Sequence, residues 1–427
     1  MFSSATFLSL LLLTISAVEA SPSRQDQGIP SVLTVASRIA ALGGKSLVDL
    51  DRQRAASLIE NANYTKSGKR SGVAPISNSG VVFDATVTVG SAATKYTLLV
   101  DTGSSNTWVG SRKTHPYKMA GAAKKTGETV SVTYGSGHFS GYEVIDSITL
   151  APGVTIQEQS IGIATSASGF SDVDGILGIG PTDLTTGTLS NQAEEIPTVI
   201  DNLVKSDSIS EKVLGIYFAP SAGSPKGELS FGQADSSKTT EAIAYVPITS
   251  SSPASRYWGI DQSITYGSQT LLAHGSGIVD TGTTLILVSD DAFATYEKAT
   301  GGKLDSNTNL LKITQAQYSA LQPLDFHIGS GVYTLNANAQ IWPRSLNSDI
   351  GGDSDSIYLV LQSFGKGGGN GWDFISGFSF LQRFYSVYDA TNKRVGFAKT
   401  GASFNSIHGS PRYINTLNPQ LTDATTN

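Results

Sequence analysis

A seven-residue motif occurs twice in this chain and constrains its architecture more than any other feature. Leu99–Ser105 (LVDTGSS) returns as Ile278–Thr284 (IVDTGTT), and each copy follows an apolar stretch that is typical of a buried strand. Each half also contains a later apolar, glycine-bearing segment, Asp174–Gly178 in the first and Asp373–Gly377 in the second. This repetition predicts a duplicated domain in which each half supplies one aspartate.

The two aspartates, Asp101 and Asp280, have neighbours suited to a buried carboxylate. The following glycines allow backbone N–H groups to approach closely, and the adjacent hydroxyls add hydrogen-bond donors. A single Asp-Thr-Gly is more often ordinary turn chemistry, but two copies in matching contexts favour function. Two carboxylates that meet share one proton and titrate as a pair. One can then accept a proton from water while the other protonates a substrate carbonyl.

The surrounding sequence predicts a β-rich body. Alternating apolar residues indicate a strand over 81–89, a nearly continuous apolar run indicates a buried strand over 96–100, and residues 130–139 read as a hairpin with a glycine tip. Short helices are predicted over 196–203 and 290–299. The chain has 45 glycines and only 15% charged residues, which suits many turns between short strands.

The first 70 residues differ from this body. Residues 1–20 contain a short apolar run that ends in small residues, which predicts a cleaved signal peptide and export from the cell. Residues 21–70 carry eight Lys or Arg against four Asp or Glu, although the whole chain has a net charge of −6. A basic segment before an acidic body predicts an inhibitory propeptide over 21–72.

Three further features belong to this leader. Lys69-Arg70 is a candidate processing site, and the one N-glycosylation sequon begins at Asn63. If a leader lysine shields the paired aspartates, the candidates are Lys45, Lys66 and Lys69.

Several other classes of function lack support. There is no cysteine, the five histidines show no helical metal-ligand spacing, and Gly-x-Ser-x-Gly does not occur, which argues against metal and serine hydrolases. The chain has no block of like charges that would indicate nucleic-acid binding. It also has no apolar run long enough to span a membrane. A glycosidase, which also uses paired carboxylates, and a non-catalytic binding or inhibitor protein remain as alternatives.

The motifs VDTGSSNTWV, YGSG, DGILG and VDTGTT resemble, in combination, those of the pepsin-like aspartic proteases, and the lack of cysteine resembles their cysteine-free basidiomycete branch. The resemblance covers residues 80–400. It implies an all-β, bilobal fold with two pseudo-twofold-related lobes and a cleft between them. The expected boundaries are 73–240 for the N-terminal lobe, 241–403 for the C-terminal lobe and 404–427 for a polar tail.

The same resemblance assigns roles to individual residues. Asp101 and Asp280 match the catalytic aspartates, and the residues expected to support them are Thr102, Gly103, Ser104, Thr281, Gly282 and Thr283. Tyr134 matches the flap tyrosine and Trp108 the tryptophan that braces it. The residues expected to touch substrate from the flap tip are Gly135 and Ser136, and those expected to line an apolar pocket are Leu99, Phe170 and Ile176. Ser376 departs from the family pattern, which usually has an apolar residue there.

The resulting prediction is a secreted, extracellular endopeptidase, made as a zymogen, that cuts between apolar residues at acidic pH. Its expected partners are protein or peptide substrates, its own propeptide as an intramolecular inhibitor, and pepstatin-type inhibitors. We expect a monomer that needs no metal or other cofactor. An acidic body predicts activity below neutrality and loss of native structure at raised pH, where buried carboxylates are forced to ionise.

Overall fold

The computed structural model describes residues 31–39, 45–62, 81–134, 137–170, 172–218, 226–365 and 369–401. Several predicted features lie outside these residues: the signal peptide, the sequon at Asn63, Lys66, the Lys69-Arg70 site, the flap residues Gly135 and Ser136, and the tail from 404.

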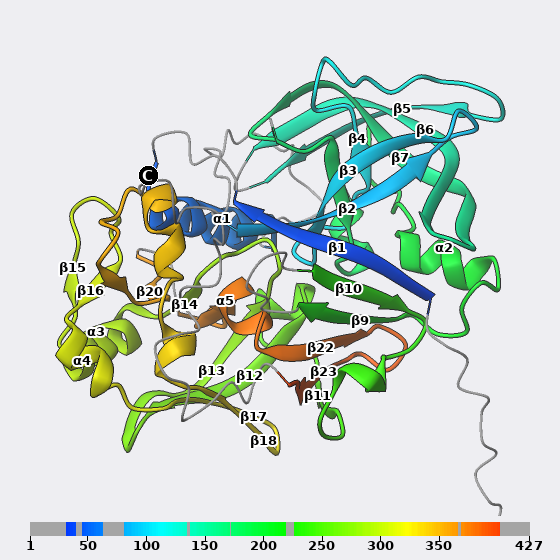
Figure 1. Cartoon of the computed structure of the whole chain (residues 1–427). Coiled ribbons are helices and arrows are strands. Elements are labelled where there is room, and N and C mark those ends of the chain that lie inside the picture. The colour runs from blue at the N-terminus through cyan, green and yellow to red at the C-terminus, as the bar shows by residue number, and fades with distance from the viewer. Residues whose placement is uncertain are drawn as a thin grey trace, which may run out of the picture.

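Strands dominate the molecule and form two barrel-like lobes, so the predicted bilobal β fold is confirmed (Figure 1). The largest sheet has thirteen strands in the spatial order β11 (Ala244–Pro247), β23 (Arg394–Lys399), β22 (Phe384–Asp389), β9 (Val213–Phe218), β10 (Lys226–Phe231), β1 (Ser31–Ile39), β2 (Val81–Val89), β3 (Thr94–Asp101), β8 (Gly175–Gly178), β4 (Trp108–Val109), β7 (Val154–Ser168), β6 (His138–Ala151) and β5 (Lys124–Thr133).

The second lobe is built on a seven-stranded sheet in the order β18 (Gly331–Leu335), β17 (Leu324–Ile328), β12 (Gly259–Tyr266), β13 (Gln269–Val279), β21 (Phe374–Ser376), β14 (Ile286–Val288) and β20 (Leu361–Ser363). A small third sheet contains β15 (Lys303–Leu304), β16 (Leu311–Ile313) and β19 (Ile357–Tyr358).

Five α-helices lie among the described residues: α1 (Leu47–Ala62), α2 (Val199–Lys205), α3 (Asp290–Thr300), α4 (Gln315–Ser319) and α5 (Phe378–Leu381). The helices predicted at 196–203 and 290–299 correspond to α2 and α3, and α2 begins three residues later because Thr198 caps it in a box with Asp201. None of the described helices is long and apolar enough to cross a membrane.

The leader is integrated into this fold. Strand β1 lies between β10 and β2 and pairs antiparallel with both. Helix α1 lies between the two lobes (Figure 1). The sequence analysis predicted neither element, and the inhibitory role that it assigns to the leader stays a prediction.

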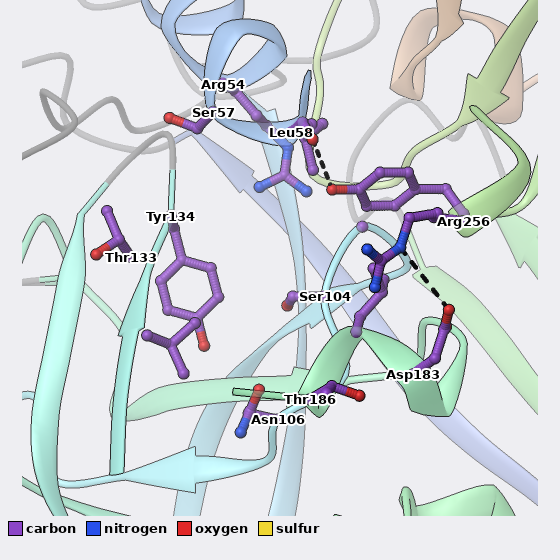
Figure 2. Close-up of a pocket in the computed structure, with 14 residues that line it drawn as sticks. Arg54, Ser57, Leu58, Ser104, Asn106, Thr133, Tyr134, Asp183, Thr186 and Arg256 are labelled. Atoms are coloured by element: carbon purple, nitrogen blue, oxygen red, sulfur yellow. Dashed lines mark hydrogen bonds and ion pairs between the residues drawn. The ribbon is translucent and has the colours of Figure 1, made fainter. Parts of the chain in front are cut away.

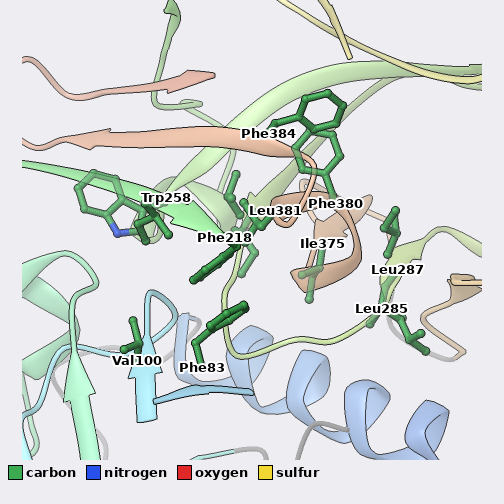
Figure 3. Close-up of a cluster of buried hydrophobic side chains, with 14 of the residues drawn as sticks. Phe83, Val100, Phe218, Trp258, Leu285, Leu287, Ile375, Phe380, Leu381 and Phe384 are labelled. Carbon is green, nitrogen blue, oxygen red and sulfur yellow. The ribbon is translucent and has the colours of Figure 1, made fainter. Parts of the chain in front are cut away.

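An extensive apolar core contains residues of both lobes. Phe83 of β2 stacks on Phe218 of β9 with ring centroids 3.5 Å apart, and Trp258 and Phe384 belong to the same buried cluster (Figure 3). Close-packed aromatic contacts of this kind fix the relative positions of the strands that carry the site.

Candidate active site

The two Asp-Thr-Gly loops meet at the centre of the molecule. Asp101 ends β3 and Asp280 directly follows β13, and both side chains are fully buried. Each of these strands has a parallel partner: β3 pairs with β8, and β13 pairs with β21. The repeated segments that follow each loop in the sequence therefore serve as the strands beside the two aspartates.

Each carboxylate receives one backbone and one hydroxyl donor. Gly103 N–H and Ser104 Oγ donate to Asp101 at 2.9 and 2.5 Å. Gly282 N–H and Thr283 Oγ1 donate to Asp280 at 3.1 and 2.6 Å. These are the donors predicted from the sequence, and such bonds favour the ionised form of a buried acid.

Two threonines lock the loops together. Thr102 N–H donates to Thr281 Oγ1 at 3.0 Å, and Thr281 N–H donates to Thr102 Oγ1 at 2.9 Å. Their hydroxyls in turn donate to Val279 and Val100 carbonyl groups across the interface. This reciprocal arrangement fixes the spacing of the two aspartates without using their carboxylates.

Ser376, the departure noted in the sequence, lies in β21 beside Asp280. Its carbonyl accepts the Asp280 N–H at 3.2 Å, and its side chain is fully buried. Among the described residues its hydroxyl has no hydrogen-bond partner. The serine at this position therefore keeps the backbone hydrogen bond that positions Asp280.

A leader cation contacts both aspartates, and it is Arg54, which was not among the three candidate lysines. Arg54 donates to Asp101 at 2.6 Å and to the two Asp280 oxygens at 2.6 and 2.8 Å. Lys45 is exposed and donates to Gln53, while Lys66 and Lys69 lie outside the described residues. A planar guanidinium can contact both carboxylates at once, which a single ammonium does less well.

The ion pair shapes the titration of the site. Burial alone would raise the pKa of Asp280, but the Arg54 charge and its hydrogen bonds hold that pKa below its usual range. Burial alone would lower the pKa of Arg54, but the charges of Asp101 and Asp280 raise it instead. The ion pair is therefore most stable with Arg54 charged and Asp280 ionised.

Other groups anchor the leader helix beside the pair. The buried carboxylate of Asp51 accepts the backbone N–H groups of Thr284 and Leu285, the latter at 2.7 Å. Arg52 donates to the Ser363 carbonyl, and Tyr257 donates to the Leu58 carbonyl at 2.8 Å. Sequence reasoning missed these contacts, although Ser46-x-x-Asp49 is a helix-start signature that could have located α1.

The predicted flap residues pack together over one side of the site. Tyr134 ends the β5 side of the hairpin, and its ring lies 6.4 Å from Trp108 and 5.4 Å, edge-on, from Phe170. Leu99 and Ile176 belong to the same buried cluster. The structure thus brings together all the described residues that were expected to form the flap and the apolar pocket.

A pocket opens between the predicted flap, the first Asp-Thr-Gly loop and the leader (Figure 2). Figure 2 shows Arg54 pointing down from α1 toward the cleft, with Tyr134 on one side and Arg256 on the other. Arg256 lies 3.9 Å from Asp183 at the rim. Because Arg54, Ser57 and Leu58 form one wall, the leader fills space that an extended peptide would need.

The described part of the chain contains no group of three or more His, Cys, Asp and Glu side chains that could hold a metal ion. The groups that the site does present are two hydrogen-bonded carboxylates at the base of a cleft.

Comparisons with known proteins agree on one group. Residues 83–400 match the family described as Eukaryotic aspartyl protease. The chain is 55% identical to polyporopepsin of Irpex lacteus over 333 residues, which cover 77% of this chain and 97% of that protein. It is 34% identical to rhizopuspepsin-1 of Rhizopus niveus over 281 residues, 62% of this chain and 69% of the relative. The crystal structure of the aspartic proteinase from Irpex lacteus superposes with a TM-score of 0.73 at 55% identity, covering 76% of this chain and 96% of that one.

Proposed function

Since the chain belongs to the eukaryotic aspartyl proteases, which are endopeptidases, we propose that Asp101 and Asp280 are its catalytic pair and that it is secreted as an acid-activated zymogen. One observation carries the proposal. Two fully buried carboxylates from different lobes, each with the same set of donors, converge on a single cation from the leader.

The mechanism follows from the position of that cation. Once Arg54 leaves, the two carboxylates face each other with a shared proton, and a water molecule takes the central place. The ionised carboxyl group accepts a proton from this water as its oxygen attacks the scissile carbonyl carbon, and the protonated one donates to the carbonyl oxygen. The resulting tetrahedral intermediate collapses with protonation of the leaving amine, without a covalent enzyme intermediate.

We infer that the substrate is an extended peptide with apolar side chains beside the cut. The cluster formed by Leu99, Phe170 and Ile176 with Tyr134 offers an apolar wall next to the first catalytic loop. Burial of an apolar side chain there contributes roughly 1.5–3 kcal/mol to binding. The hairpin that carries Tyr134, with Gly135 and Ser136 at its tip, would cover the bound main chain.

The leader, residues 21–72, acts in this proposal as an intramolecular inhibitor. Docking lowers the pKa of Asp280, so this contribution to docking is present above the pKa of the free carboxyl group and is lost as the pH falls. Acidification therefore protonates Asp280 and releases Arg54.

Asp51 has the opposite effect in a different pH range. Burial raises its pKa from 3.8 to about 7, despite lowering contributions from the backbone of Leu285 and Thr284. Docking therefore becomes more favourable as the pH falls from about 7 toward 3.8, and below that this contribution no longer changes. The two effects together confine release of the leader to pH values near or below the usual carboxyl range.

Export and maturation complete the proposal. Residues 1–20 would be removed on export, and cleavage at or just after Lys69-Arg70 would separate the leader from the lobes at 73–240 and 241–403. The mature enzyme would act as an extracellular monomer.

Proteolysis of denatured globin from about pH 2.5 to about pH 8, with and without pepstatin, tests the function. We expect cleavage confined to acidic pH and abolished by pepstatin but unaffected by a metal chelator. Absence of cleavage by matured, folded protein would favour the non-catalytic binding protein instead. Hydrolysis of polysaccharides in place of globin would favour the glycosidase.

A further inference from the structure

Two buried hydroxyl groups lie beneath the catalytic loops on strand β22. Ser386 and Tyr388 are at most 1% exposed, and neither hydroxyl makes a hydrogen bond of normal length and angle with a described residue. An unsatisfied buried hydroxyl is costly, so its retention calls for an explanation.

The alternation of β22 places both side chains on the face that packs into the main core. Phe384 and Tyr388 belong to the main core that joins the lobes, whereas Tyr385 and Val387 belong to a separate cluster on the opposite face. Ser386 lies between the first two and shares their face.

Tyr388 touches the supports of both aspartates. Its ring lies 5.2 Å from Trp258, whose carbonyl accepts the Val279 N–H just before Asp280. The Trp258 indole donates to the Ile179 carbonyl, and the Ile179 N–H donates to the carbonyl of Asp101.

The Tyr388 hydroxyl also lies close to Thr102. Burial raises the pKa of Tyr388 above its usual range and the Asp280 charge adds to this, whereas the hydroxyls of Ser386 and Thr102 lower it. Thr102 Oγ1 accepts one hydrogen bond from Thr281 N–H and donates one to Val279, which leaves it one further acceptor position.

The buried hydroxyl groups of β22 have no counterpart on the neighbouring strand β9. Strand β9 runs beside β22, and the residues directly opposite Ser386 and Tyr388 are Ile216 and Leu214. Opposite residues in an antiparallel pair share a face, so the β9 side presents only apolar groups there. The donors to the two aspartates are otherwise nearly equivalent.

We propose that Tyr388, assisted by Ser386, is a positioning residue for the catalytic pair: its hydroxyl donates to Thr102 Oγ1, directly or across one bound water, and makes the two carboxyl groups inequivalent. The inference rests on the proposed catalytic role of Asp101 and Asp280. A hydroxyl dipole with its hydrogen toward the loops favours the ionised form of the pair, and so helps to keep one carboxylate ready to accept the proton of the water.

The charged groups that face this hydroxyl are few. The charge that acts on it is that of Asp280, which contacts Arg54 while the leader is docked. The strands beside Tyr388 place Leu214 and Val395 next to it, neither of which titrates.

The test compares matured Tyr388→Phe, Ser386→Ala and wild-type enzymes on one peptide substrate across the acidic range. For Tyr388→Phe we expect kcat to fall about fivefold, the equivalent of one neutral hydrogen bond, with KM unchanged. We also expect the apparent pKa on the acid side of the kcat profile to rise by about 0.5 unit. Ser386→Ala should also lower kcat and raise this apparent pKa, but by smaller amounts.

Tyr385→Phe is the matched control, since Tyr385 lies on the other face of β22 and bonds to Ser230 and Asp235. It should lower thermal stability without moving the pH profile. A Tyr388→Phe enzyme that only melts earlier, with wild-type kcat and pH profile, would overturn the inference while wild-type activity stood. A folded wild-type enzyme without pepstatin-sensitive activity would overturn the proposed function as well.

Discussion

At the scale of single residues, the identity of the leader cation is the main departure from the sequence prediction. Arg54 is nearly fully buried and contacts both aspartates with short, charge-assisted hydrogen bonds. The five N–H donors of a guanidinium lie in a rigid plane, whereas an ammonium is a compact point charge. The geometry of two facing carboxylates therefore favours arginine.

Replacing Arg54 should weaken latency in the uncleaved chain. Because removing one partner of a buried ion pair typically costs about 3 kcal/mol or more, Arg54→Ala should raise pepstatin-sensitive activity before leader cleavage by at least about tenfold. Arg54→Lys should lie between Ala and wild type. The measurement is the initial rate on a fluorogenic peptide at mildly acidic pH, with the intact leader verified by electrophoresis.

Lys45→Ala is the control, since Lys45 was a sequence candidate but lies exposed beside Gln53. It should leave latency unchanged. A fully latent Arg54→Ala chain would show that the other contacts of α1 suffice to block the cleft.

Glu143 on β6 is a second residue with a predictable effect. Burial raises its pKa from 4.5 to about 7, although a hydrogen bond from Ser160 at 2.8 Å lowers it. A raised pKa in the folded state gives stability below 4.5 that is lost as the pH rises through about 7. The loss amounts to about 3 kcal/mol at most.

Glu143→Gln should therefore make the protein more stable than wild type at pH 7 and above, with little difference at pH 4. Denaturant unfolding at the two pH values measures this, and Glu158→Gln on the exposed side of β7 serves as control. Equal stability of Glu143→Gln and wild type at neutral pH would contradict the assignment.

At the scale of elements, strands were predicted well and the leader was not. The period-two pattern of 81–89 and the apolar run at 96–100 correspond to β2 and β3 because one or both faces of these strands are buried in the body. Helix α1 was missed because its buried face includes Asp51 and Arg54, which interrupt the apolar periodicity. Strand β1 finds its partners in β10 and β2, far away in the sequence.

The start of α1 offers a test of how the helix contributes to latency. Ser46 Oγ accepts the Asp49 N–H at 3.2 Å and donates to the Asp49 side chain at 2.7 Å, while Asn309 of the body also donates to it. Ser46→Ala should destabilise the docked helix by about 1 kcal/mol.

Hydrogen exchange of the α1 amides in the uncleaved chain measures this effect, and Ser46→Thr, which keeps the hydroxyl, is the control. Faster exchange in Ser46→Ala alone is expected. Equal exchange in both variants would mean that packing, not the cap, holds the helix.

At the scale of the whole molecule, the repeated motif predicted a duplicated domain. The family resemblance, which rests on this motif and two others, implied two lobes and is confirmed. The donors around Asp101 and Asp280 were also predictable, because they lie within three residues of each aspartate. The contacts of Asp51, Arg54 and Tyr388 were not predictable from the sequence. Each depends on elements brought together only by the complete fold.

The proposed mechanism requires two carboxylates, one from each lobe, that act as a unit. The most direct test measures kcat of the matured enzyme on one apolar peptide for Asp101→Asn, Asp280→Asn and the double variant. We predict that each single substitution lowers kcat by at least about a thousandfold, and that the double variant is no slower than the singles. A single variant that kept a tenth of the wild-type rate, or a double variant whose loss equalled the product of the two single losses, would contradict the paired mechanism.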